Sequence, residues 1–306
     1  MGQGTSSQPR FVFRSQSVCI CGTRLDSAVH SHVIKHHWGE ICFYSCSWCG
    51  TWCQSPQVTT ASLVAWYDSD LYQGSDGRSG VAYDNYEADE SQRLAEARDR
   101  FSRYIAPWLS RSPADILEIG CASGSLLAIA RHAGNRVTGV DLSSRFAEQA
   151  RRLNQLEVNV GNFLQLPLPE RAFDAVFLFG TASNLRDLPK ALRRIRRLIR
   201  EDGRVFLNFP HSDSWPARIY GRHFWMFAPS VATFASTAGM CRCVTNNGWS
   251  IEALSLDYQR PSFGKLIKHT KLADVLPESL TKIVSPRLLP VSIPIPAVKY
   301  ARLRPV

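Results

Sequence analysis

The chain has 306 residues, of which 44% are hydrophobic and 20% charged, and its formal net charge is +10. At about 150 residues per domain, this predicts one large domain with a smaller module, and the composition excludes a disordered chain. No apolar run approaches the roughly 20 residues of a membrane-spanning helix, and the N-terminal MGQGTSSQPR lacks the apolar core of a secretory signal. We therefore expect no membrane span and a cytoplasmic location.

Cysteines gather near the N-terminus, with six of the nine between positions 19 and 53. An odd, clustered set without a secretory signal favours a metal site over a disulfide framework. Cys46-Ser-Trp-Cys49-Gly is a C-x-x-C-G knuckle, and Cys19-Ile-Cys21-Gly is a partner one residue shorter. The simplest assignment is a structural, tetrahedral Zn²⁺ on Cys19, Cys21, Cys46 and Cys49. One alternative is free thiols without a metal, and another is a different ligand drawn from nearby residues: Cys42, Cys53, His30, His32, His36 or His37.

The residues between the knuckles predict a ribbon hairpin, because polar residues separate the apolar ones: Val33, Ile34, Ile41 and Phe43. Residues 1–57 are therefore predicted as a zinc-ribbon-like module. A charged helix is expected over residues 89–109, since apolar residues recur there at helical spacing: Leu94, Ala97, Phe101, Ile105 and Trp108. Residues 58–110 are predicted as a helical linker.

Apolar strands alternate with helices from residue 115 onward. Strands are expected at residues 115–120, 136–141, 173–179 and 204–209. The third is apolar almost throughout, as expected for a strand buried on both faces. This alternation predicts an α/β fold with a doubly wound, Rossmann-like parallel sheet.

The turn after the first of these strands predicts a nucleotide site. It reads Glu118-x-Gly120-x-Ala122-x-Gly124, and Asp141 ends the next strand twenty-one residues after Gly120. Small residues let the backbone approach a ligand, and an acid at this place accepts hydrogen bonds from ribose hydroxyls. The acid at Glu118 does not suit a pyrophosphate. It suits a ligand with an ammonium group and no phosphate, as in the methionine portion of S-adenosylmethionine.

Residues 115–210 resemble class I S-adenosylmethionine-dependent methyltransferases. The resemblance rests on the order and spacing of five stretches: Leu117-Glu-Ile-Gly-Cys-Ala-Ser-Gly124, Val137-Thr-Gly-Val-Asp141, Gly161-Asn-Phe-Leu-Gln-Leu-Pro167, Phe173-Asp-Ala-Val176 and Arg197-Leu-Ile-Arg-Glu-Asp-Gly203. It implies a seven-stranded sheet whose last strand runs antiparallel. Residues 111–306 are assigned to this domain, with an acceptor-side insertion at about 211–240.

The resemblance also implies the donor-binding residues. Gly120, Cys121 and Gly124 would line the methionine side, and Glu118 would support the turn and the ammonium group. Asp141 would hold the ribose. Leu142 would pack on the adenine, bracketed by Asn162 and by the ring or backbone of Phe163. Phe179 and Gly180 would lie beneath the sulfonium. The family often has Gly at the position of Ala122 and Asp at that of Asn162.

The order of segments is also similar to that of bacterial methyltransferases that act on sugars, surface polysaccharides and natural products. It consists of a cysteine ribbon, a tyrosine-rich segment and this core. Residues 58–110 would therefore be a donor-site lid as well as a helical linker, and their tyrosines would close over the donor: Tyr67, Tyr72, Tyr83 and Tyr86. Residues 211–225 resemble the acceptor-side insertion of these enzymes. Aromatic residues there would wall an apolar pocket or simply pack a lid on the sheet edge: Trp215, Tyr220, Phe224, Trp225 and Phe227.

A hydroxyl or amine acceptor requires a base, whereas a carboxylate does not. The candidates are His211, His223 and Tyr220, with Asn208 and Asp213 beside them, and His211 comes first because it follows the end of a strand. The family's usual Arg-His-Leu stretch is missing, since Ser230-Val-Ala-Thr-Phe234 stands there. The acceptor therefore cannot be carried over from the family.

Basic residues leave partner classes open, since a positive surface suits nucleic acid, an anionic membrane or an acidic substrate. Five arginines are expected on the solvated face of one helix: Arg193, Arg194, Arg196, Arg197 and Arg200. We expect methyl transfer to a small-molecule, glycosyl or peptide acceptor. The alternatives are a ribosomal-RNA methyltransferase and a non-catalytic binding protein that retains the fold. Against base-amine methylation, Gly180-Thr-Ala-Ser-Asn184 replaces the Asn/Asp-Pro-Pro-aromatic motif.

Overall fold

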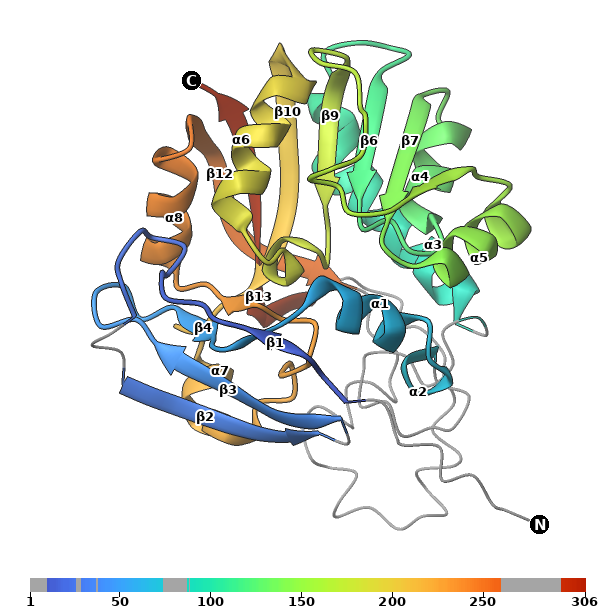
Figure 1. The fold of residues 1–306 in the computed structure, drawn as a ribbon. Helices are drawn as coiled ribbons and strands as arrows, with labels where there is room; N and C mark the ends of the chain where they lie inside the picture. Colours follow the sequence, from blue (N-terminus) through green and yellow to red (C-terminus); the bar gives the residue numbers. More distant parts are fainter. Residues whose placement is uncertain (1–9, 26–28, 37, 74–86, 88, 260–292) are drawn as a thin grey trace, which may run out of the picture.

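A seven-stranded sheet forms the centre of the molecule, and Figure 1 shows its strands running side by side. Its spatial order is β12 (Trp249–Gln259), β13 (Ile293–Pro305), β10 (Ile199–Pro210), β9 (Phe173–Leu178), β6 (Asp115–Ile119), β7 (Arg136–Asp141) and β8 (Val158–Val160). The strands from β10 to β8 are parallel, and β13 pairs antiparallel with both β10 and β12. The predicted doubly wound sheet with an antiparallel last strand is confirmed. The computed structural model describes residues 10–25, 29–36, 38–73, 87, 89–259 and 293–306.

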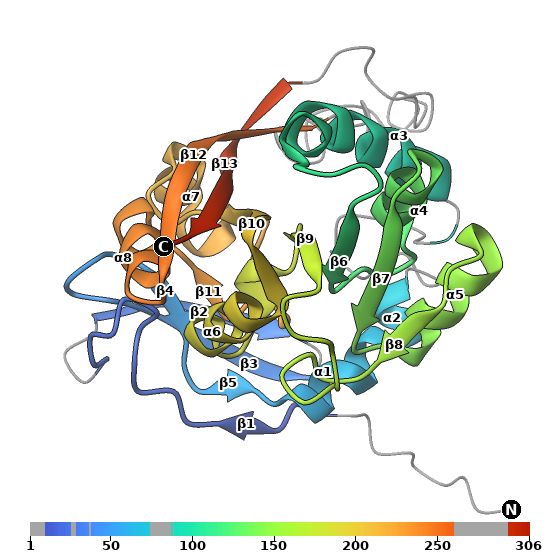
Figure 2. The ribbon, with the colours of Figure 1, turned by 90° about the horizontal axis from the view of Figure 1, so that it is seen from above.

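Helices cover both faces of this sheet, as the view from above in Figure 2 shows. On one face lie α3 (Glu90–Arg100), α4 (Ser125–His132) and α5 (Ser144–Asn154), and on the other α6 (Leu188–Leu198) and α8 (Thr237–Thr245). Each face has its own hydrophobic core. The first is built around Phe101, Leu127 and Phe177, and the second around Leu178, Ile195 and Trp249.

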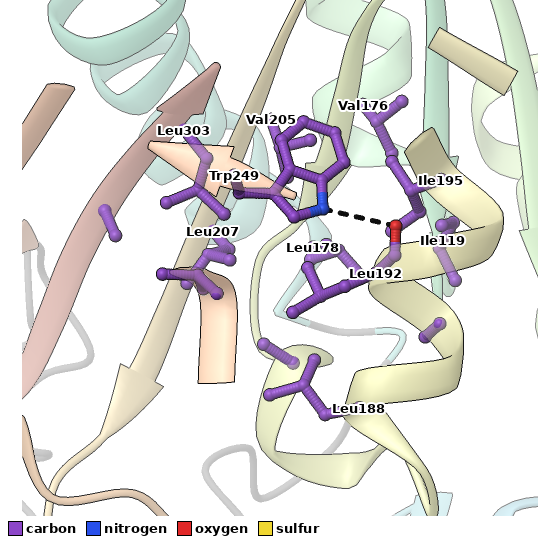
Figure 3. Packing of buried hydrophobic residues seen from close by; sticks show 14 of the residues in the cluster. Ile119, Val176, Leu178, Leu188, Leu192, Ile195, Val205, Leu207, Trp249 and Leu303 are labelled. Carbon is purple, nitrogen blue, oxygen red and sulfur yellow. Dashed lines mark hydrogen bonds between the residues drawn. The ribbon is translucent and has the colours of Figure 1, made fainter. Parts of the chain in front are cut away.

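Trp249 anchors the second core at the start of β12. Its indole ring is 1% exposed, and its Nε1–H donates to the carbonyl oxygen of Leu192 at 3.3 Å. Figure 3 shows the ring among aliphatic side chains of α6, β10 and β13, with this hydrogen bond as a dashed line. A buried indole needs such a partner, because an unpaired N–H in a core costs about 1–3 kcal/mol. The bond therefore fixes how α6 lies against β12.

A second sheet combines the N-terminal module with the later insertion. Its order is β11 (Thr233–Phe234), β4 (Trp52–Gln54), β3 (Gly39–Ser45) and β2 (Val29–His36), while β1 (Phe13–Arg14) pairs with β5 (Gln57–Val58). The β2–β3 hairpin lies where the sequence predicts a ribbon. Because β11 pairs with β4, the insertion completes this sheet. In Figure 1 this sheet lies below the larger one, where the parallel strands end.

The aromatic residues of the insertion mainly pack this small sheet against the rest of the chain. Phe224 is 2% exposed, and Phe227 stacks on Trp52 with ring centroids 5.8 Å apart. Trp215, on α7 (Trp215–Tyr220), is instead 59% exposed. Of the two readings of these residues, a packed lid describes the structure better than an apolar acceptor pocket. The short helix η4 (Gly221–His223) follows α7.

The charged helix before the large sheet is longer than α3 alone. A π-helical turn, η1 (Phe101–Ile105), and a 3-10 turn, η2 (Ala106–Trp108), continue it, which agrees with the prediction for residues 89–109. Upstream of it are α1 (Thr60–Tyr67) and α2 (Asp70–Gln73), and η3 (Ala182–Asn184) follows β9. None of the helices in the described part of the chain is long and apolar enough to cross a membrane.

The prediction of five arginines on the solvated face of one helix needs two corrections. Helix α6 ends at Leu198, so Arg200 lies on β10. Its guanidinium pairs with Asp174, which is fully buried, at 2.8 Å, and with Asp115 at 3.1 Å. Arg194 does not face solvent either, because it donates to the carbonyl oxygen of Leu166. The apolar spacing predicted a helix that runs too far, because Ile199 continues the spacing of α6 although it is the first residue of β10.

Candidate functional site

The turn after β6 has a backbone that few side chains allow. Gly120, Ala122 and Gly124 all have positive φ values, of 73°, 48° and 74°. A Cβ on Gly120 would lie 2.3 Å from the Thr181 hydroxyl oxygen, so only glycine fits there. Ala122 adopts the left-handed conformation at a cost of about 1–2 kcal/mol, which a glycine at this position would avoid.

Asp141 holds this turn in place. Its Oδ2 accepts the backbone N–H of Ala122 at 2.8 Å, and its Oδ1 accepts that of Ser143 at 2.9 Å. The carboxylate is 8% exposed, and burial raises its pKa to about 6, although these hydrogen bonds oppose the shift. A carboxylate at the end of β7, beside a glycine-rich turn, is placed to accept ribose hydroxyls.

Glu118 lies on β6, two residues before the turn, and is 5% exposed. Its Oε2 has no hydrogen-bond partner among the described residues. Burial raises its pKa to about 8, while the nearby Arg100 acts in the opposite direction. A buried carboxyl oxygen without a donor is costly, and a cationic or N–H group of a ligand would relieve it. Glu118 thus suits the ammonium group that the sequence predicts.

The residues predicted around the adenine have different surroundings. Leu142 is half-buried directly after β7, and the Asn162 side chain accepts the N–H of Leu164 at 3.0 Å. The Phe163 ring is 4% exposed within the core, and the Arg194 guanidinium lies 5.4 Å from its centroid. Because the ring is packed inward, the backbone of Phe163 is the part that can face a ligand.

Two acids that the sequence did not single out bring the N-terminal helices to this site. Asp68, at the end of α1, accepts the hydroxyl of Ser143 and the N–H of Arg145. Glu90, at the start of α3, accepts the hydroxyl of Ser123, inside the glycine turn, at 3.0 Å. Neither acid lies in a motif, and their partners are 75, 77 and 33 residues away along the chain, so no local pattern could have revealed them.

The tyrosines predicted to close over the donor are described only in part. Tyr67 and Tyr72 contact each other, with ring centroids 4.9 Å apart, and the Tyr72 ring lies 5.9 Å from Phe146 of α5. Burial raises the pKa of Tyr67 to about 12. Tyr83 and Tyr86 lie outside the described residues.

Four thiols converge in the N-terminal module. The sulfur atoms of Cys19, Cys21, Cys46 and Cys49 all lie within 4.8 Å of one another. The Cys19–Cys49 and Cys21–Cys46 distances are 3.7 Å and 3.8 Å. Two sulfurs on a tetrahedral Zn²⁺ at about 2.3 Å would be roughly 3.8 Å apart, so this set fits the ion. Cys53 is buried beside the four, whereas Cys42 is only half-buried.

Polar contacts connect the second knuckle to the large domain. The Cys49 sulfur lies 3.2 Å from the Thr51 hydroxyl oxygen, which accepts the N–H of Ser236, the residue that caps α8, at 3.0 Å. Next to it, the Ser212 hydroxyl donates to the carbonyl oxygen of Gly50 at 2.8 Å. The metal module is therefore docked on the segment that follows β10.

His211, the first candidate base, is engaged at both ring nitrogens. Nδ1 lies 2.7 Å from Asp213 Oδ1, and Nε2 lies 3.0 Å from the carbonyl oxygen of Pro296. Both partners are hydrogen-bond acceptors within the chain, so neither ring nitrogen is directed toward a substrate. Burial opposes ionisation of Asp213, but hydrogen bonds from His211 and Thr237 outweigh it and hold its pKa well below the ordinary value. This geometry disfavours His211 as a base.

The other two candidates remain predictions. His223 is exposed on η4, and its Nε2 accepts a hydrogen bond from Arg222 at 3.3 Å. Tyr220 is half-buried at the end of α7, with its ring 5.4 Å from that of Trp225. Neither is directed by a described contact toward the glycine turn.

With this geometry established, comparison with known proteins identifies the domain. Residues 117–207, which include the turn and Asp141, match the family described as "Methyltransferase domain". The chain contains a class I S-adenosylmethionine-dependent methyltransferase domain. Among solved structures, the geranyl diphosphate C-methyltransferase of Streptomyces coelicolor is similar to it with a TM-score of 0.52 and 14% identity, over 81% of this chain and 98% of that one. At this identity the likeness concerns the fold.

Matches to known sequences cover a smaller part of the chain. An uncharacterized 37.1 kDa protein in transposon TN4556 of Streptomyces fradiae is 34% identical over 122 residues, which cover 35% of each chain. The malonyl-[acyl-carrier protein] O-methyltransferase of Pseudescherichia vulneris is 27% identical over 193 residues, or 60% of this chain and 71% of that protein. The chain thus spans about a third of the length of the first of these relatives.

Proposed function

We propose that the chain transfers a methyl group from S-adenosylmethionine to a small-molecule, glycosyl or peptide acceptor. The observation that carries the proposal is the Asp141 carboxylate, held by backbone N–H groups beside the glycine turn where β6 and β7 end. A carboxylate at that edge binds ribose, and a turn of this shape brings the backbone close to the ligand. The malonyl-[acyl-carrier protein] O-methyltransferase among the relatives supports a small acceptor.

In this assignment the chain mainly binds and aligns. Asp141 would accept the ribose hydroxyls, Glu118 would face the ammonium group, and Gly120 would allow the close approach. S-Adenosylmethionine supplies an already activated methyl group, so alignment of donor and acceptor accounts for most of the rate. His211 would remain a hydrogen-bonded structural residue, which leaves Tyr220 and His223 as the candidate bases for an acceptor that must lose a proton.

We further propose that Cys19, Cys21, Cys46 and Cys49 hold one structural Zn²⁺. Four thiolates fill a tetrahedral ion completely, leaving no position for catalysis. Contact with the Cys19 sulfur, together with burial, raises the pKa of the Cys49 thiol to about 12, and a bound cation would reverse this by favouring the thiolate. The cytoplasmic location stays a prediction from the sequence.

RNA is a less suitable acceptor because several of the basic residues are engaged within the chain. Arg193 donates to the side-chain oxygen of Asn247 at 2.6 Å, and Arg200 pairs with Asp115 and Asp174. RNA binding depends on many free cationic side chains and weakens steeply with salt.

The test is a mass search for products that gain 14 Da when the purified chain and S-adenosylmethionine meet a panel of acceptors. The panel contains glycosyl, acyl-carrier, quinone and peptide compounds together with ribosomal RNA at two salt concentrations. We expect a methylated small molecule or peptide with the native chain and none with Asp141→Ala. Methylation of RNA, with tight and salt-sensitive binding, would instead establish the RNA alternative. Labelled donor that reaches no acceptor in the panel or in a cell extract would support the non-catalytic alternative.

A further inference from the structure

The two peptide groups that flank Gly180 are each hydrogen-bonded by an asparagine side chain. Gly180 follows β9, where the sulfonium is expected, with φ of +67° and open space where a Cβ would stand. Its N–H donates to Oδ1 of Asn208 at 2.6 Å, and its carbonyl oxygen accepts from Nδ2 of Asn184 at 3.0 Å. The bond to Asn208 orients the peptide between Phe179 and Gly180, and the bond from Asn184 orients the peptide that follows Gly180.

The orientation of the Asn208 amide is itself determined by a buried acid. Nδ2 of Asn208 donates to Oδ2 of Asp257, on β12, at 2.8 Å. An ionised carboxylate only accepts and a backbone N–H only donates, so the amide satisfies both neighbours in one orientation. Asn208 is 6% exposed and Asp257 is 0% exposed, so water does not offer the amide an alternative partner.

Arg100 balances the charge of Asp257 and also contacts the residue before Gly180. Its Nη2 lies 3.7 Å from Oδ2 of Asp257, and its guanidinium lies 4.7 Å from the centroid of the Phe179 ring. Tyr300 stacks on that ring, with centroids 6.4 Å apart and planes 7° from parallel. Phe179 and Gly180 are thus both fixed by residues connected to Asp257.

We propose that Asp257 is a positioning residue of the methyl-transfer site, acting through Asn208 on the Gly180 peptide; this rests on the proposed function. Asp257 lies 77 residues beyond Gly180 on another strand and has no place among the methyltransferase motifs. Its role is to keep Asn208 in the orientation that presents an acceptor to Gly180. Without the carboxylate, the amide could turn over, and its NH₂ group would then face the N–H of Gly180.

The test compares Asp257→Asn with Asp174→Asn. Asp174 is a matched control, since it is also 0% exposed and pairs with an arginine, Arg200, at 2.8 Å. It lies at the start of β9, whereas Gly180 follows the end of that strand. Each variant is labelled with ¹⁵N-glycine, the Gly180 resonance is assigned through its loss in Gly180→Ala, and binding of S-adenosylhomocysteine is measured by calorimetry.

We expect Asp257→Asn to shift the Gly180 resonance and to speed the hydrogen exchange of its N–H at least tenfold. The variant should also bind S-adenosylhomocysteine about tenfold more weakly. Asp174→Asn should lower the melting temperature but leave the Gly180 resonance unchanged and the affinity within twofold. Equal behaviour of the two variants would overturn the proposal. If Asp257→Asn does not fold, Asn208→Ser removes the same contact while keeping the Arg100–Asp257 pair, and an unchanged Gly180 exchange rate in that variant would overturn it too. Failure of the native chain to bind S-adenosylhomocysteine would count against the proposed function, whereas Gly180 exchange still tests the role of Asp257.

Discussion

The donor site and the thiol cluster differ in what holds them together. At the donor site, the chain supplies its own hydrogen bonds: Asp141 to Ala122 and Ser143, and Glu90 to Ser123. In the thiol cluster, the buried sulfurs mainly contact one another, and Ile20 and Leu25 are the aliphatic residues that pack against them within the described part of the chain. A site built on backbone hydrogen bonds folds without its ligand, whereas a cluster of thiols with so little core depends on a metal. Removal of the ligand should therefore have opposite consequences in the two regions.

The largest effect is expected from Cys46→Ser, which removes one of the four thiols. Zinc binding by structural sites contributes on the order of 10 kcal/mol, so the two knuckles should lose both their metal and their local structure. Elemental analysis should find about one zinc in the native chain and much less in the variant. Cys42→Ser, outside the cluster, serves as control and should keep full zinc. A metal-free native chain with an intact module would refute the zinc assignment, and full zinc in Cys46→Ser would refute the ligand set.

A smaller effect is expected from Asp141→Ala at the donor site. The variant loses charge-assisted hydrogen bonds worth roughly 1.5–3 kcal/mol, so S-adenosylmethionine should bind about 10- to 150-fold more weakly. Calorimetry measures this directly. Asp115→Ala, an acid at the opposite end of the sheet, should leave the affinity unchanged. Normal binding by Asp141→Ala would remove the ribose assignment.

The buried acids also predict how binding depends on pH. Burial raises the pKa of Asp141 to about 6 and that of Glu118 to about 8, so the donor-free chain takes up protons at both groups on folding. Its free energy of unfolding should therefore fall as pH rises from about 4 to 8. A cationic donor favours the ionised acids, so its affinity should rise across pH 6–8. Titrations at several pH values test this, and Glu118→Gln should flatten the upper part of the rise. A flat native profile would contradict the interpretation of these two acids.

The smallest effect is expected from Ala122→Gly. Ala122 has a φ of +48°, and glycine removes a left-handed strain of about 1–2 kcal/mol while adding roughly 0.5–1 kcal/mol of chain entropy to the unfolded state. The free energy of unfolding should rise by about 0.5–1 kcal/mol in denaturant titrations. Gly120→Ala is the opposite case and should lower the free energy of unfolding, because the added Cβ would collide with Thr181. A loss of stability in Ala122→Gly would show that the turn is not strained.

The sequence predicted those parts of the molecule that depend on local patterns. Strands β6, β7, β9 and β10 follow from apolar runs, whereas β8 was not predicted, and the thiol knuckles follow from Cys spacing close to that of zinc ligands. Strand β13 could not be located from the sequence, because its place in the sheet depends on pairing with β10 and β12 and not on a local pattern. The same holds for β11, which joins β4 across 180 residues.

The site residues also divide into those that a local motif predicts and those that only the contacts in the structure reveal. Glu118, Gly120 and Asp141 lie in motifs, and the structure brings them to one edge of the sheet. Asp68, Glu90 and Asp257 act on that edge from distant segments, and their roles appear only when the contacts are known. For His211, the place after a strand suggested a base, while the structure adds that Asp213 and Pro296 contact its two ring nitrogens.

The most direct test of the central claim is a calorimetric titration of the purified chain with S-adenosylmethionine and, separately, with S-adenosylhomocysteine. We predict saturable binding of one molecule per chain with a dissociation constant on the order of micromolar, or about −8 kcal/mol. The zinc content of the same sample should be unchanged after the titration, since the two sites are separate. Absence of heat from either ligand in a folded, zinc-loaded chain would contradict the assignment of a donor site at Asp141.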